Sequence, residues 1–172
     1  MSLFKTMVVY SSKTGNTKKV AEEIMKVLPG NTDIFPVEKA PDPSEYDFIA
    51  AGFWVDRGTA ETKALEYFKK IENKKVAIFI TLGAYPDSAH AEKVVENAKK
   101  LFGEKNEVLG HFICQGKIDP ALTEKFKDLP PDHPHAMTPE RKARHEEAKK
   151  HPDSKDFKNA CQAFKGIMEE NF

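Results

Sequence analysis

Near its start the chain reads VVYSSKTGNT, from Val8 to Thr17, and a stretch of helical amphipathic spacing follows from Lys18 to Leu28. The apolar residues predict a β-strand, the amphipathic stretch predicts a helix, and the polar residues between them predict a tight loop. The first N–H groups of a helix have no intrahelical partner, and the positive end of the helix dipole lies there, so an anion is stabilised. This stretch therefore predicts a phosphate-binding pocket.

The residue types in the loop indicate which class of phosphate ligand it can bind. Hydroxyl groups of Ser11, Ser12, Thr14 and Thr17 can donate hydrogen bonds, and Gly15 allows a close approach of the backbone. No Gly-Lys-Ser/Thr ending is present, so the loop suits a phosphate monoester better than a nucleoside triphosphate with its Mg²⁺. The alternative is a Ser/Thr-Gly loop that only caps the helix.

Composition sets the class of protein. The chain has 172 residues, of which 40% are hydrophobic and 31% charged, and these values predict one soluble domain over residues 1–172. Lysine plus arginine equals aspartate plus glutamate at 27 each, so no global basic field draws the chain to nucleic acid. No apolar run approaches the roughly 20 residues of a membrane span, and no signal peptide is evident. We expect a cytoplasmic protein without a membrane partner.

The two cysteines, Cys114 and Cys161, lie far apart and have no Cys-x-x-Cys or Cys/His ligand spacing. This argues against a disulfide framework, a zinc site and an iron–sulfur cluster. We expect both to be buried apolar residues.

Apolar runs alternate with stretches of helical periodicity, which is typical of an α/β fold with a parallel sheet covered on both faces. The expected strands are 6–10, 32–37, 48–53, 76–82 and 108–114, and the expected helices are 16–28, 59–73, 87–102 and 154–169. Five such strands suit a sheet of order 2-1-3-4-5, in which ligands bind at the carboxyl ends of the strands.

Residues 116–152 interrupt the alternation as an inserted segment rich in proline and histidine. Asp119-Pro120 and Thr138-Pro139 predict the starts of two short helices, 121–128 and 140–150. The histidines allow a metal site or solvated side chains, and their unspecific spacing favours the latter, so no metal ligand is assigned. The basic residues from Arg141 to Lys150 alternate with glutamates and favour an exposed helix with i,i+4 pairs over a docking patch.

Two further loops are expected at the carboxyl edge of the sheet. One follows the third strand and contains Trp54, the only tryptophan, whose ring could cover a planar ligand or pack on a neighbouring helix. The other follows the fourth strand, where Gly83 allows close approach and Tyr85 offers a second aromatic ring or a simple turn before Pro86.

The spacing Ser12-x-Thr14-Gly15-x-Thr17, together with these loops, resembles the flavodoxin family over nearly the whole chain. The resemblance implies a flavodoxin-like three-layer sandwich and FMN as cofactor. The FMN phosphate would lie on Ser11, Ser12, Lys13, Thr14, Gly15, Asn16 and Thr17. The isoalloxazine ring would lie between Phe53, Trp54, Val55, Asp56, Arg57 and Gly58 on one side and Leu82, Gly83, Ala84 and Tyr85 on the other.

This chain departs from the family pattern in three respects. It is neutral where flavodoxins are commonly acidic, it lacks the Gly-x-x-x-Trp-Gly spacing after the third strand, and it carries the inserted segment 116–152. Lys13 and Arg57 lie beside the expected ring, and positive charge there favours an anionic reduced flavin and raises its potential.

The resemblance implies a non-catalytic carrier that passes electrons between partner redox enzymes, a reductase or an oxidase, as a monomer or weak dimer. A second hypothesis is an FMN-dependent NAD(P)H:quinone reductase or a protoporphyrinogen-oxidase-like enzyme, with the inserted segment as a lid. A third is a flavodoxin-fold scaffold without flavin, which the complete hydroxyl set of the first loop disfavours. No Gly-x-Gly-x-x-Gly motif is present, which favours the carrier, and no catalytic residue is assigned.

Overall fold

The computed structural model describes residues 3–172, and within them strands and helices alternate up to the end of the last strand. The strands are β1 (Thr6–Tyr10), β2 (Thr32–Pro36), β3 (Phe48–Asp56), β4 (Thr59–Ala60), β5 (Lys75–Leu82) and β6 (Glu107–Gln115). The helices are α1 (Asn16–Met25), α2 (Thr62–Phe68), α3 (Ala89–Gly103), α4 (Pro120–Phe126), α5 (Pro139–Ala148) and α6 (Ser154–Asn171), with the 3-10 turns η1 (Val37–Lys39) and η2 (Pro43–Glu45).

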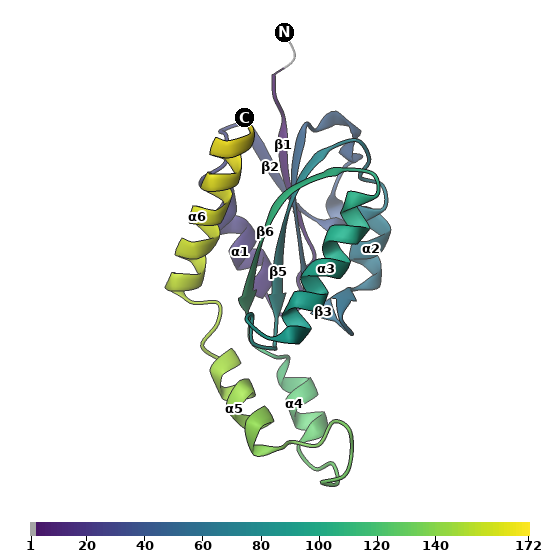
Figure 1. Ribbon diagram of the computed structural model, residues 1–172, viewed down its shortest axis with the longest axis vertical. Helices are drawn as coiled ribbons and strands as arrows, with labels where there is room; N and C mark the ends of the chain where they lie inside the picture. The colour runs from purple at the N-terminus through teal and green to yellow at the C-terminus, as the bar shows by residue number, and fades with distance from the viewer. Residues whose placement is uncertain (1–2) are drawn as a thin grey trace.

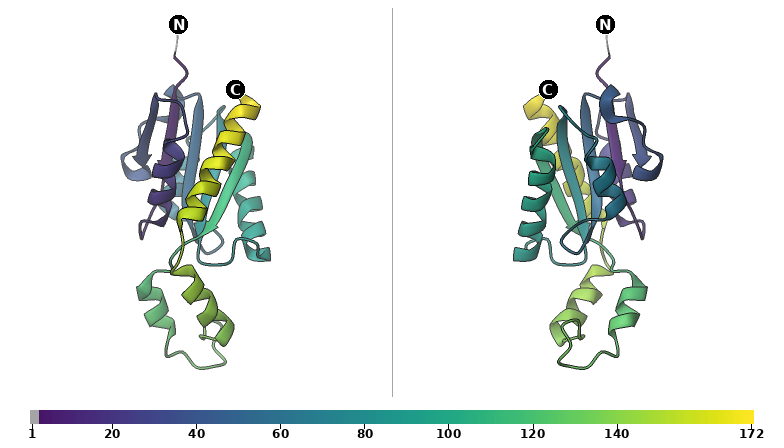
Figure 2. Two further views of the ribbon diagram at one scale, coloured as in Figure 1. Left: turned by 90° about the vertical axis from the view of Figure 1, so that its left-hand side faces the viewer. Right: turned by 90° about the vertical axis from the view of Figure 1, so that its right-hand side faces the viewer.

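The sheet runs in the order β2-β1-β3-β5-β6 with all neighbours parallel, and β4 pairs antiparallel with the end of β3. Counted without β4, this is the predicted order 2-1-3-4-5. Helices α1 and α6 cover one face of the sheet, and α2 and α3 cover the other (Figures 1 and 2). The α/β three-layer prediction is confirmed.

Each face of the sheet has its own core because successive side chains of a strand point to opposite faces. Met7, Val9 and Ile49 pack toward α2 and α3, whereas Val8 and Ala50 pack toward α1 and α6. All five are fully buried. Strands buried on both faces read as continuous apolar runs, which explains why the three inner strands β1, β3 and β5 were predictable. The edge strands β2 and β6 are only partly buried.

The region after β3 differs from the prediction. The expected strand end at Phe53 and the expected helix start at Thr59 are wrong, because β3 continues to Asp56 and turns back into β4. Arg57 and Gly58 have positive φ angles of 51° and 83°, as a two-residue hairpin turn of type I′ requires. The helix then starts only at Thr62, after its N-cap Glu61.

The two cysteines differ in burial. Cys114 is 2% exposed in the core between β5, β6 and α6, as expected, but Cys161 is only half-buried. Its thiol lies 3.4 Å from the carbonyl oxygen of Glu23 and links α6 to α1. The expectation of burial therefore holds for Cys114 alone.

Helix starts inside the segment 116–152 follow the local signals. The carboxylate of Asp119 accepts the N–H of Ala121 at 2.9 Å, and the hydroxyl of Thr138 accepts the N–H of Arg141 at 3.2 Å. The two helices extend beyond the carboxyl ends of the strands as a projection from the sheet (Figure 1). Within residues 3–172, every helix is too short or too polar to span a lipid bilayer.

Gly52 in the centre of β3 is required by close packing across the sheet. A Cβ atom built on it would lie 1.9 Å from the ring of Phe79, which is fully buried against Phe164 of α6. The Phe79 ring therefore occupies the space above Gly52, and no other residue fits without displacing it.

Gly52→Ala is expected to lower the free energy of unfolding by about 1–3 kcal/mol, because an added methyl group in a full core forces the ring aside. Gly166→Ala is the matched control, since its Cβ would meet nothing within 4 Å on α6 and should stabilise the helix by about 0.5–1 kcal/mol. Urea unfolding curves measure both changes. Equal stability of the Gly52→Ala variant and the parent would contradict this account of the core.

Candidate functional site

The first loop, residues 11–15, connects β1 to α1 at the carboxyl edge of the sheet. Gly15 is the N-cap of α1 with φ of 93°, and as a glycine it offers no capping side chain. Among residues 3–172, no partner accepts a hydrogen bond from the main-chain N–H of any residue from 12 to 17. The first N–H to be satisfied is that of Lys18, which donates to Ser12 Oγ at 3.3 Å. A run of free donors at the positive end of a helix is an anion-binding site.

Two of the four hydroxyl groups hold the loop in place. Ser11 Oγ donates to Glu61 Oε1 at 2.6 Å, and the hydroxyls of Thr17 and Thr81 share a buried hydrogen bond of 2.8 Å. Ser12 is half-buried and Thr14 is exposed, so these two remain able to meet a ligand. The sequence predicted that all four hydroxyl groups could donate to a ligand. In the structure, those of Ser11 and Thr17 bond within the protein, and those of Ser12 and Thr14 are accessible.

Glu61 was not singled out from the sequence. Its carboxylate accepts the N–H groups of Lys63 and Ala64 at the start of α2, at 2.9 and 3.1 Å, and also the hydroxyl of Ser11. The N-cap of α2 thus anchors the first loop through one side chain. A glutamate just before a predicted helix is the local signal, but its partner 50 residues away is not visible in the sequence.

Trp54 lies in a strand and not in a loop, which corrects the expected location. It pairs with Thr81 of β5 in the sheet, and its side chain is half-exposed at the edge beside the first loop. The ammonium group of Lys13 lies 5.6 Å from the centre of its ring and 3.0 Å from a carboxylate oxygen of Asp119. The structure therefore brings together the first loop, the end of β3 and the start of α4.

The other residues expected after the third strand have different surroundings. Phe53 is 1% exposed and packs against Phe68, so only its main chain can face a ligand. Val55 is half-buried against the α2 and α3 side, while Asp56 and Arg57 are exposed on the hairpin. Of this group, Trp54 is the side chain that the structure brings next to the first loop.

The loop after β5 starts in a fixed position. Gln115 Nε2 donates to the carbonyl oxygen of Gly83 at 3.0 Å, and a Cβ on Gly83 would lie 2.6 Å from Ile118. Leu82 is buried, Ala84 is half-buried, and Tyr85 is 39% exposed. The missing side chain of Gly83 therefore leaves room for Ile118 of the segment 116–152, which packs closely against its main chain.

The base of the segment 116–152 is tied to the first loop. Asn16 Nδ2 donates to the carbonyl oxygen of Lys117 at 2.9 Å, and the N–H of Lys117 donates to the carbonyl oxygen of His151 at 3.0 Å. Near the middle of the segment, His145 Nδ1 lies 3.1 Å from the hydroxyl of Thr123 and joins α5 to α4. Helix α4 therefore starts near the edge that carries the candidate site, and α5 returns to it (Figure 2).

His151 connects α5 to α6 through carboxylates. Its Nδ1 lies 2.6 Å from Asp156 and its Nε2 lies 3.2 Å from Glu147, while Asp153 is 3.9 Å away. The ring nitrogen and carboxylates lie close enough to hold a metal ion. However, Asp153 and Asp156 already accept each other's main-chain N–H in a capping box, so the cluster serves the start of α6.

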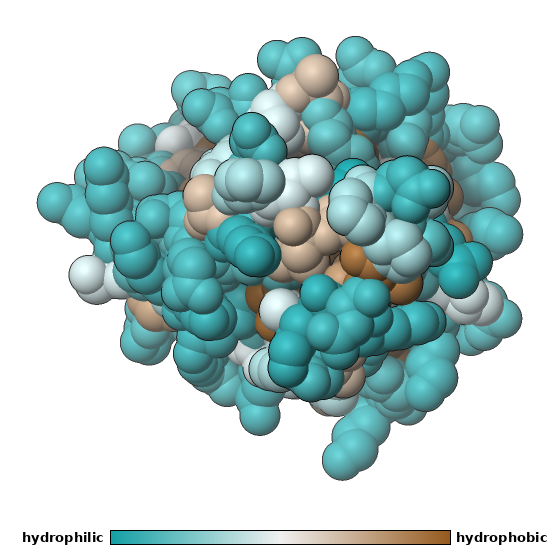
Figure 3. Space-filling model, turned by 90° about the horizontal axis from the view of Figure 1, so that it is seen from below, coloured by the Kyte–Doolittle hydropathy of each residue, from teal (hydrophilic) through white to brown (hydrophobic). Residues whose placement is uncertain are grey.

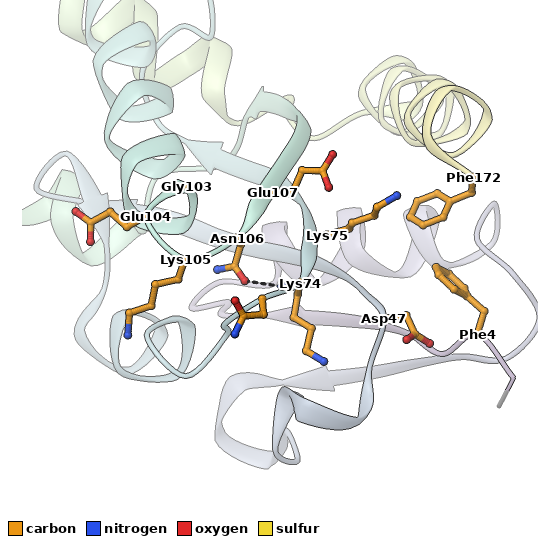
Figure 4. Close-up of a pocket in the computed structure, with 11 residues that line it drawn as sticks. Phe4, Asp47, Lys74, Lys75, Gly103, Glu104, Lys105, Asn106, Glu107 and Phe172 are labelled. Carbon is orange, nitrogen blue, oxygen red and sulfur yellow. Dashed lines mark hydrogen bonds between the residues drawn. The ribbon is translucent and has the colours of Figure 1, made fainter.

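A cavity lies at the opposite end of the sheet. It measures about 720 Å³ and opens at the amino ends of the strands, between Phe4, Asp47 and the C-terminal Phe172 (Figure 4). Its lysines have partners: Lys74 donates to the carbonyl oxygen of Ser44 and Lys75 to that of Asn171.

The comparisons with known proteins agree with this geometry. The family model described as "Flavodoxin domain" matches residues 7–165. The chain belongs to the flavodoxin domain family. It is 36% identical over 171 residues to the flavodoxin-like domain-containing protein BilS of Clostridioides difficile (strain CD3), covering 95% of this chain and 96% of that protein.

Solved structures share the flavodoxin fold. Oxidised flavodoxin 1 from Bacillus cereus superposes with a TM-score of 0.62 at 16% identity, covering 98% of this chain and 99% of that one. A flavoprotein from Lactobacillus acidophilus NCFM, solved in complex with FMN, gives 0.50 at 19% identity, covering 72% and 98%.

His151→Gln is expected to change the pH dependence of stability. Burial opposes the charge of His151, but hydrogen bonds to Asp156 and Glu147 outweigh it and raise its pKa above 6.5. The raised pKa means that the folded protein holds this proton more tightly than the unfolded chain does. The resulting stabilisation is complete below pH 6.5 and is lost as the pH rises through the raised pKa.

Thermal unfolding of parent and variant, measured from below pH 6.5 to above the raised pKa of His151, isolates the contribution of this imidazole to stability. The stability advantage of the parent should be largest at acidic pH and shrink as the solution becomes alkaline. His133→Gln, at an exposed histidine of the segment 116–152, controls for loss of an imidazole. A parent-minus-variant difference that does not depend on pH would refute the role of the imidazolium.

Proposed function

We propose that this flavodoxin-family protein binds FMN and carries electrons between partner redox proteins. The observation that carries the proposal is the run of free main-chain N–H groups from residue 12 to 17 at the start of α1. A phosphate monoester accepts several hydrogen bonds at once and needs no metal ion there. The proposal is also supported by the family membership and by the structural neighbour solved with FMN.

The first loop offers the phosphate dianion of FMN both accessible hydroxyl groups and a positive charge. Thr14 is exposed and Ser12 half-buried, so both hydroxyls are accessible beside the free N–H groups. Lys13 supplies a positive charge, although Asp119 shares it at 3.0 Å. FMN, when bound, supplies one- and two-electron redox chemistry, and the protein contributes binding and orientation.

Two aromatic side chains are available for the isoalloxazine ring. Trp54 is half-exposed beside the first loop, and Tyr85 is 39% exposed in the loop after β5. A flat ring stacked on an aromatic face gains more than burial alone and is shielded from water. In the proposed complex, Trp54 and Tyr85 cover the ring, while Leu82 and Phe53 contribute only through their main chain because their side chains are buried.

The end of the molecule that carries the site suits a transient partner. Seen from this end, the surface has a hydrophilic rim around a central area of neutral and apolar side chains (Figure 3). Tyr85 and Leu122, at 39% and 42% exposure, are the large exposed apolar side chains of the β5–α3 loop and of α4. A small apolar centre within a charged rim is typical of weak, reversible docking.

Thr14→Asp is expected to weaken FMN binding by roughly tenfold or more, or about 1.4 kcal/mol, because a carboxylate then lies among the N–H groups that the phosphate needs. Riboflavin, which lacks the phosphate, should bind parent and variant equally. Quenching of Trp54, the only tryptophan, reports binding in both titrations. Ser154→Asp places the same charge at the exposed first residue of α6 and is the matched control.

Parallel loss of FMN and riboflavin affinity in Thr14→Asp would mean that the loop does not hold the phosphate. No binding of FMN by the parent would leave only the flavin-free scaffold.

A second measurement separates the carrier from an enzyme. The FMN-loaded protein, mixed anaerobically with NADPH or NADH, is expected to keep its oxidised flavin absorbance until a flavodoxin reductase is added. The reason is that a carrier accepts electrons from a docked protein and has no nicotinamide site of its own. Rapid bleaching by either nucleotide alone would overturn the carrier and favour an NAD(P)H-dependent oxidoreductase.

A further inference from the structure

A second, smaller cavity lies between the β5–α3 loop and α5. It measures about 210 Å³. Tyr85, Ser88 and His90 form one wall, and Arg141 and Arg144 of α5 contribute to the other, with Glu140 also lining the space. The cavity therefore joins the proposed flavin loop to the segment 116–152.

The guanidinium group of Arg144 has one buried nitrogen without a partner. Its Nε is buried, and among residues 3–172 it is one of two buried side-chain nitrogen or oxygen atoms without a hydrogen bond, the other being the uncharged hydroxyl of Thr6. No ion pair involves Arg144 within the described chain. Burial of a charged donor without an acceptor is costly, so the position calls for an acceptor from outside the chain.

Other cations of the same helix behave differently. Lys149 and Lys150 form i,i+3 pairs with Glu146 and Glu147 at 2.6 and 2.9 Å. Arg141 donates one hydrogen bond to the carbonyl oxygen of Ala136 at 2.7 Å and, like Arg144, has no carboxylate within ion-pair distance in the described part of the chain. Lys142 also has no carboxylate within ion-pair distance in the described part of the chain, but it is exposed and lies outside the cavity. Arg141 and Arg144 are thus the cations without an anion that line the cavity.

The residues that line the cavity include only one carboxylate, and the start of a helix lies beside them. Ser88 caps the start of α3, and the positive end of that helix dipole lies beside the cavity together with His90. Glu140 contributes a single carboxylate against the two guanidinium groups. A monoanion can therefore enter without an excess of negative charge.

Shape and chemistry select the class of anion. Guanidinium groups match the flat carboxylate by parallel hydrogen bonds, and the rings of Tyr85 and His90 offer flat walls to an apolar body. At about 210 Å³ the cavity is smaller than the roughly 300–1,000 Å³ that whole drug-sized ligands occupy, so it fits a small acid or one end of a larger one.

We propose that this cavity binds the carboxylate of a small organic acid, with Arg144 as its principal donor and Arg141 as the second. The site does not require FMN. If the proposed function is also correct, Tyr85 belongs to both sites, and the acid lies next to the flavin.

The test observes Arg144 directly. The arginine Nε–H signals of ¹⁵N-labelled protein are followed by NMR during titration with benzoate, at ionic strength kept constant with chloride. One Nε–H signal, absent in Arg144→Gln, is expected to shift saturably. Arg144→Gln should weaken benzoate binding, followed through the amide signals of the β5–α3 loop, by roughly tenfold or more through loss of a charge-assisted hydrogen bond.

Lys142→Gln is the matched control, because Lys142 is an exposed cation of the same helix outside the cavity and its variant should bind benzoate like the parent. Arg144→Lys keeps the charge but loses the planar fork, and should also bind weakly; it keeps the test decisive where Arg144→Gln fails to fold. Titrations with FMN-free and FMN-loaded protein separate failure of this site from failure of FMN binding.

Absence of a saturable shift, or equal benzoate affinity in Arg144→Gln and Lys142→Gln, would overturn the site. A parallel titration with inorganic phosphate tests the class of anion. Tighter binding of phosphate than of benzoate at the Arg144 signal would overturn the carboxylate assignment.

Discussion

The buried hydrogen bond between the hydroxyls of Thr17 and Thr81 fixes the start of α1 against β5. Thr17 is fully buried and Thr81 is 1% exposed, so neither hydroxyl has water as an alternative partner, and separating them would leave both unsatisfied. The orientation of the first turn of α1, and with it the direction of the free N–H groups, depends on this contact. Ser11 and Glu61 fix the other end of the loop in the same way. The candidate phosphate site is therefore held in position by two of its four hydroxyl groups, those of Ser11 and Thr17.

Features of the fold that depend on neighbouring residues could be predicted from the sequence, whereas features that depend on unusual backbone angles or distant contacts could not. The three inner strands β1, β3 and β5 could be predicted because burial on both faces requires continuous apolar runs. Gly15 could be placed at the start of α1 because helix starts have local signals. The hairpin β3–β4 could not, since it requires Arg57 to adopt a positive φ that non-glycine residues rarely take. Trp54 therefore lies in a strand, where the sequence indicated a flexible turn.

The segment 116–152 shows the same division. Asp119-Pro120 and Thr138-Pro139 predicted the two helix starts from neighbouring residues alone. The position of this segment at the carboxyl edge of the sheet was not predictable. It depends on the contacts of Lys117 with Asn16 and His151, which join distant parts of the chain. The charge pattern of α5 indicated a wholly exposed helix with i,i+4 pairs. This holds for Lys149 and Lys150, although their pairs are i,i+3, but not for Arg144, whose guanidinium faces the β5–α3 loop.

Electrostatics at the site differ from what the sequence alone implied. Lys13 and Arg57 suggested two free positive charges beside the flavin, but the ammonium of Lys13 is shared between the ring of Trp54 and the carboxylate of Asp119. The N–H of Ala121 and the ammonium of Lys13 in turn lower the pKa of Asp119, which keeps that carboxylate charged. Because an ion pair has a much weaker field than a single charge, Lys13 adds less stabilisation to an anionic reduced flavin than its position suggests. In the proposed complex, the main-chain N–H groups of the first loop then hold the phosphate. In that complex, Trp54 and Tyr85 cover the ring and shield it from water.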